Sequence, residues 1–131
     1  MKSIPTILPI YAAIFALFFV FLSIRTIRAR RSLQIGLGDA GNKDMQRAIR
    51  VHANFAEYVP LCLLMLYLVE QSGVYAWFMH ALGTGLLVGR LSHAYGVSQQ
   101  RESFAFRITG MTMTFTVLIA SAAHLLWVAV K

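Results

Sequence analysis

Three long stretches of this chain carry no charged side chain, and they constrain the fold more than any other feature. They cover residues 3–24, 71–89 and 108–130. As an α-helix, a run of roughly 20 apolar residues spans the hydrocarbon core of a bilayer. A fourth apolar stretch, 58–69, is shorter, so it spans only if the polar residues before it continue the same helix. We predict an all-α membrane protein of one domain, 1–131, a four-transmembrane-helix bundle with helices at about 4–28, 44–70, 74–96 and 104–130.

The composition supports this class and excludes two kinds of site. Of the 131 residues, 58% are hydrophobic and 13% are charged, whereas about a quarter of the residues of a soluble domain are charged. Cys62 is the only cysteine, so the chain can form no internal disulfide. We also expect no metal site, because the chain offers too few ligands of this type.

The basic residues follow a pattern that predicts topology rather than nucleic-acid binding. Seven of the twelve Lys and Arg lie between Arg25 and Arg50, three more flank the third-to-fourth connection, and the second-to-third connection has none. Basic connections stay in the cytoplasm. We therefore predict that the first and third connections are cytoplasmic and that both termini lie outside. This asymmetry accounts for the formal charge of +7, and we predict no nucleic-acid partner.

A row of polar residues precedes the shorter apolar stretch. Arg50, Asn54 and Glu57 are spaced four and then three apart, which puts them on one face of a helix. At ~1.5 Å per residue the row is roughly 10 Å long, the length of a small, extended ligand with several charges. Polar side chains at a membrane boundary are costly. The row therefore predicts either a binding site or an interhelical network that fixes packing.

Two further features concern helix ends and helix contacts. Asp44 is placed to cap the second helix. Gly85 and Gly89 form a GxxxG pair, which lets helices approach closely in lipid. Arg90 follows at once, with His93 on the same face.

These residues resemble a known family. Arg50-x-x-x-Asn54-x-x-Glu57-Tyr58-x-Pro60 resembles the second-helix motif of the MAPEG family, the membrane-associated proteins in eicosanoid and glutathione metabolism. Gly89-Arg90-x-x-His93 is similar to that family's third-helix motif. Arg107 resembles its thiol-facing arginine, and Arg30-Arg31 also has a counterpart. The chain is most similar to the short bacterial members, which implies an integral protein of the bacterial inner membrane.

The resemblance implies a homotrimer that binds glutathione between subunits near the cytoplasmic surface. It implies Arg107 as the catalytic residue, since a cation lowers the pKa of a thiol from ~8.5. Arginines suit the carboxylates of glutathione, and Asn54 can hold an amide. Glu57 can pair with the ammonium or orient an arginine. The implied glutathione-binding residues are Arg50, His52, Asn54, Glu57, Tyr58, Arg90, His93, Arg30 and Arg31.

The predicted activity is that of a glutathione-dependent transferase or peroxidase acting on an apolar electrophile or lipid hydroperoxide. A groove open to lipid would deliver that apolar small molecule. Two tyrosines of some relatives are absent: Thr109, Gly110 and Met111 stand where one would lie, and Val97 replaces the other. Two alternatives remain open. One is a non-catalytic trimer that binds a lipid or glutathione, as in the lipid-binding branch of the family, and the other is a proton-coupled exporter that uses Glu57.

Overall fold

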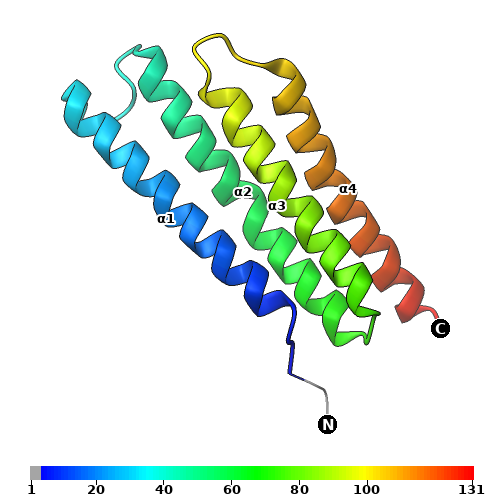
Figure 1. The fold of residues 1–131 in the computed structure, drawn as a ribbon. Coiled ribbons are helices and arrows are strands. Elements are labelled where there is room, and N and C mark those ends of the chain that lie inside the picture. Colours follow the sequence, from blue (N-terminus) through cyan, green and yellow to red (C-terminus); the bar gives the residue numbers. More distant parts are fainter. Residues whose placement is uncertain (1–3) are drawn as a thin grey trace.

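The computed structural model describes residues 4–131 and shows a bundle of four helices, each antiparallel to the next in sequence (Figure 1). The start of α1, the α2–α3 connection and the end of α4 lie at one end of the bundle, and the other two connections lie at the opposite end (Figure 1). The predicted domain 1–131 includes residues 1–3, which lie outside the described residues. The helices are α1 (Leu8–Leu33), α2 (Lys43–Gln71), α3 (Ala76–Ser98) and α4 (Phe104–Ala129).

The polar row and the apolar stretch that follows it belong to one unbroken helix. α2 continues through Pro60 and, at ~1.5 Å per residue, is roughly 43 Å long. The apolar stretch 58–69 and the polar residues before it therefore form one helix, which is long enough to span a bilayer core. The first helix differs most from its predicted bounds, because it begins at Leu8 rather than near residue 4 and reaches Leu33 rather than residue 28.

Three of the four helices, α1, α2 and α4, are long and apolar enough to cross a membrane. α3 does not reach that composition because it carries His80, Arg90 and His93 among its apolar residues. It packs against all three other helices, and the side chains of Arg90 and His93 are buried. Arg90 and His93, in the half of α3 nearer the α3–α4 connection, therefore face protein rather than lipid, as intramembrane polar residues generally do.

Carboxyl and amide side chains fix two helix starts. The Asn42 side chain accepts hydrogen bonds from the Asp44 and Met45 amides at 2.9 and 3.0 Å. Asn42, not Asp44, is therefore the cap of α2. At the opposite end of α2, the Glu70 carboxylate accepts hydrogen bonds from the backbone amides of Thr6, Ile7 and Leu8, each at 2.8 Å. Because an amide at a helix N-terminus has no partner within the helix, Glu70 ties the start of α1 to the end of α2.

α3 and α4 approach each other through glycines, but of the predicted GxxxG pair only Gly89 lies in the close contact, where an added Cβ would lie 2.9 Å from Met113 Cβ. A Cβ atom added at Gly110 would lie 2.5 Å from the Gly89 carbonyl oxygen, and one added at Gly96 would lie 2.7 Å from the Arg107 amide nitrogen. No real Cβ makes such contacts, so the two backbones require glycine there. Gly85 differs, because a Cβ added there would meet only Val117, at an ordinary 3.6 Å.

Gly110→Ala should therefore destabilise the bundle, and Gly85→Ala should not. We expect a loss of about 1–3 kcal/mol for Gly110→Ala, because the methyl group overpacks a backbone contact. Thermal unfolding in detergent, followed by helical circular dichroism, measures the difference. Equal stability of the two variants would contradict the close α3–α4 contact.

Candidate functional site

A small polar pocket opens at the end of the bundle that carries the α1–α2 and α3–α4 connections. It has a volume of about 110 Å³. Its walls come from α2, α3, the connection before α4 and α4 itself. The lining residues are Arg50, Asn54, His93, Val97, Glu102 and Arg107. Four of the ten residues predicted for the site thus lie around one cavity, although they come from three different helices.

The guanidinium of Arg90 lies inside the bundle behind this pocket. Only 1% of the residue is exposed. Arg90 Nη2 donates to Asn54 Oδ1 at 2.6 Å, and Nη1 donates to Thr114 Oγ1 at 3.4 Å. Because a guanidinium only donates, the amide oxygen of Asn54 must face Arg90, and its amide nitrogen is left for the pocket. Arg90 therefore positions Asn54, and a direct contact of Arg90 with a ligand stays a prediction.

His93, which lines the pocket, carries a buried polar atom without a partner among the described residues. It is 3% exposed, and its Nδ1 atom has no hydrogen-bond partner among residues 4–131. A buried polar atom without a partner is uncommon and calls for an explanation. Gly110 packs directly against the His93 backbone, so the close α3–α4 contact holds the imidazole in place.

Arg107 is paired with a carboxylate that sequence reasoning missed. Arg107 Nη1 lies 2.6 Å from Glu102 Oε1. The two side chains are 43% and 32% exposed, so the pair lies at the edge of the pocket. One signal could have identified Glu102: it is the only acidic residue after Glu70, and it lies five positions before the arginine predicted to be catalytic.

Two predicted binding residues of α2 point toward other helices. His52 Nε2 lies 3.0 Å from the Ser23 hydroxyl, and its ring stacks on Phe19 of α1. Tyr58 packs edge-to-face against Phe115 of α4, with ring centroids 5.7 Å apart. Neither residue lines the pocket. Within one chain both serve packing between helices.

The two arginines at the end of α1 also lie apart from the pocket. Arg30 Nη1 donates to the Gly38 carbonyl at 2.9 Å and so holds the α1–α2 connection. Arg31 is exposed. Both line a separate shallow depression with Gln34, Ile35 and Gly36. Their predicted part in ligand binding would therefore require another subunit.

Glu57 is exposed and does not line the pocket either. It lies at the middle of α2, equally far from Lys43 and Gln71. A carboxylate facing lipid at such a depth would be costly, so we expect another protein surface to pack against this face of α2.

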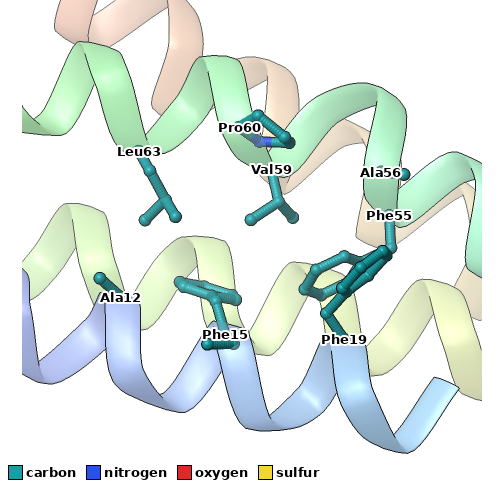
Figure 2. Close-up of a pocket in the computed structure, with 9 residues that line it drawn as sticks. Ala12, Phe15, Phe19, Phe55, Ala56, Val59, Pro60 and Leu63 are labelled. Atoms are coloured by element: carbon teal, nitrogen blue, oxygen red, sulfur yellow. The ribbon is translucent and has the colours of Figure 1, made fainter. Parts of the chain in front are cut away.

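An apolar groove separates α1 and α2 on the side away from the pocket. It has a volume of about 260 Å³. Figure 2 shows Phe15 and Phe19 of α1 opposite Val59 and Leu63 of α2. Arg107 is not among its lining residues. In a single chain, the space suited to an apolar molecule and the predicted catalytic arginine therefore lie on different helix pairs.

Comparison with known proteins identifies the fold family. The sequence profile of the MAPEG family matches residues 8–127. The chain belongs to the MAPEG family. It is 34% identical over 118 residues to the inner membrane protein YecN of Escherichia coli strain K12, an alignment that covers 90% of this chain and 88% of YecN. YecN of strain O6:H1 (CFT073) matches equally well.

Membership in the MAPEG family confirms the predicted resemblance and the membrane-embedded four-helix bundle. It also relates the chain to membrane proteins of glutathione metabolism. The description of YecN as an inner membrane protein gives a location and no reaction. The reaction of this MAPEG chain must therefore be argued from its own site.

The link between Arg90 and Asn54 predicts how this MAPEG site responds to substitution. Asn54→Leu should lower the free energy of unfolding by about 2–3 kcal/mol, because a buried charge loses its strongest hydrogen bond. Asn54→Asp should keep the stability, because a carboxylate can accept from Arg90. Thermal unfolding of both variants in detergent is the measurement. A stable Asn54→Leu protein would show that Arg90 does not depend on Asn54.

Proposed function

We propose that this chain is a membrane-bound, glutathione-dependent transferase or peroxidase of the bacterial inner membrane. The observation that carries the proposal is the polar pocket, which brings Arg50, Asn54, His93 and Arg107 together at one end of a MAPEG bundle. We further propose that this end faces the cytoplasm, because the basic residues concentrate there.

The chemistry of the pocket matches the groups of glutathione. Arg50 is exposed at the rim, where a guanidinium can take a carboxylate by two charge-assisted hydrogen bonds. The amide nitrogen of Asn54 suits a peptide carbonyl. Arg107 supplies a cation for the thiol, which attacks electrophiles as the thiolate. His93 Nδ1 adds one further polar contact.

The site of one chain is too small for the whole ligand, which supports a site completed by another subunit, as in the homotrimer that the family resemblance implies. Pockets that bury a small molecule usually have volumes of roughly 300–1,000 Å³, whereas this one has about 110 Å³. Glu57 is exposed on the same helix as Arg50 and Asn54. A neighbouring subunit that packs on α2 would cover Glu57 and complete the site, with Arg30 and Arg31 as residues that a neighbour could contribute.

A non-catalytic membrane trimer that binds a lipid or glutathione is the second candidate. The apolar groove between α1 and α2 favours it (Figure 2), because its lining side chains are all apolar and suit an acyl chain. Binding without turnover would distinguish this function from catalysis. The mid-helix position of Glu57 fits an exporter, but membership in the MAPEG family argues against that function.

Glu57→Gln tests whether the exposed carboxylate belongs to the ligand site. If Glu57 contacts the ammonium of glutathione or orients an arginine, the change should weaken glutathione binding about three-fold or more, because one charge-assisted contact is lost. Asp39→Asn, in the α1–α2 connection, is the control and should bind normally. Calorimetric titration of the detergent-purified protein gives both affinities. Unchanged affinity of Glu57→Gln would remove Glu57 from the site.

Arg107→Ala tests catalysis directly. The rate of glutathione conjugation to an apolar aryl halide should fall roughly 10- to 100-fold, because the thiol loses the cation that favours its ionisation. Arg101→Ala removes the same charge from an exposed position in the α3–α4 connection and should keep the rate. Equal rates for the two variants would exclude Arg107 as the catalytic residue.

A further inference from the structure

Glu102 is held in place beside the pocket by the short connection between α3 and α4. The Ser103 amide donates to the Gly96 carbonyl at 3.1 Å, and the Arg107 amide donates to the Ser103 carbonyl at 3.1 Å. These bonds fix the backbone on the C-terminal side of Glu102. The carboxylate then reaches Arg107 Nη1 at 2.6 Å and lines the cavity with Arg50, Asn54 and His93.

Glu102 already pairs with Arg107, the cation that a bound thiol would need in order to ionise. Arg107 is the only arginine besides Arg50 among the residues that line the pocket. While Glu102 pairs with it, the positive charge is already neutralised. Both side chains are about one third or more exposed, and exposed ion pairs are weak. An anion that binds in the pocket can therefore displace Glu102 at little cost.

We infer that Glu102 is a competing carboxylate, which holds Arg107 when the pocket is empty and releases it when an anionic thiol binds. This inference rests on the proposed function. When the thiol ionises, its proton goes to water and the thiolate takes the place of the Glu102 carboxylate at Arg107. Glu102 thereby lowers the affinity of the site for the thiolate, so that the bound thiol ionises at a higher pH than it would without Glu102.

Glu102→Gln tests the inference, because it removes the negative charge and keeps the size of the side chain. The two measurements are the affinity for glutathione and the ultraviolet thiolate band as a function of pH, both on the detergent-purified protein. We expect roughly three- to five-fold tighter binding, since a weak ion pair no longer competes, and a thiolate band that appears at lower pH. Glu102→Asp, which keeps the charge on a shorter side chain, should lie between Glu102→Gln and the wild type.

Two controls separate this effect from a general change of charge. Asp44→Asn breaks the other ion pair among the described residues, Asp44–Arg47 at 2.9 Å, and should change neither measurement. S-methylglutathione has no ionisable thiol. Its affinity should be the same, within about two-fold, for the wild type and Glu102→Gln, because nothing replaces Glu102 at Arg107.

The remaining outcomes overturn the inference in distinguishable ways. Unchanged glutathione affinity in folded Glu102→Gln would show that Glu102 does not compete. Weaker affinity would show that Glu102 contacts the ligand, for example its ammonium. Equal tightening for S-methylglutathione would show that Arg107 faces a carboxylate rather than the thiol. Absence of glutathione binding in both wild type and variant would overturn the proposed function together with the inference.

Discussion

The buried guanidinium of Arg90 is the interaction on which the rest of the site depends. A charge inside a helix bundle is tolerated only where it has hydrogen-bond partners, and Arg90 of α3 donates hydrogen bonds to Asn54 of α2 and Thr114 of α4. One side chain therefore fixes three helices relative to one another. The glycine contacts between α3 and α4 make this geometry possible. The polar pocket lies directly beside this network because Asn54 belongs to both.

The four-helix membrane fold could be predicted from the sequence because bilayer length and missing charge determine it. The site could be predicted only in part. Helical spacing correctly put Arg50, Asn54 and Glu57 along α2, but Asn54 is buried while the other two are exposed. This difference in burial depends on how closely α3 packs against α2, which the spacing of residues along α2 alone does not show. Glu102 was missed for a similar reason, since its pairing with Arg107 depends on the path of a short connection.

The pocket of a single chain is too small for the proposed ligand, so the proposed function requires a second subunit. The pocket has room for part of glutathione, Glu57 lies uncovered at the middle of a membrane helix, and the apolar groove is separated from Arg107. Each of these features calls for a second surface. A trimer of MAPEG chains would supply that surface for all three. In the proposed mechanism, the ion pair of Glu102 with Arg107 is the contact that a bound thiolate would replace.

The central claim is that this chain binds a thiol and ionises it beside Arg107. The most direct measurement is the ultraviolet difference spectrum of the detergent-purified protein on addition of glutathione at neutral pH, for wild type and Arg107→Lys. We predict a saturable thiolate band for the wild type and a band for Arg107→Lys as well, because lysine keeps the cation. Saturable binding of glutathione to the wild type without any thiolate band would contradict the claim.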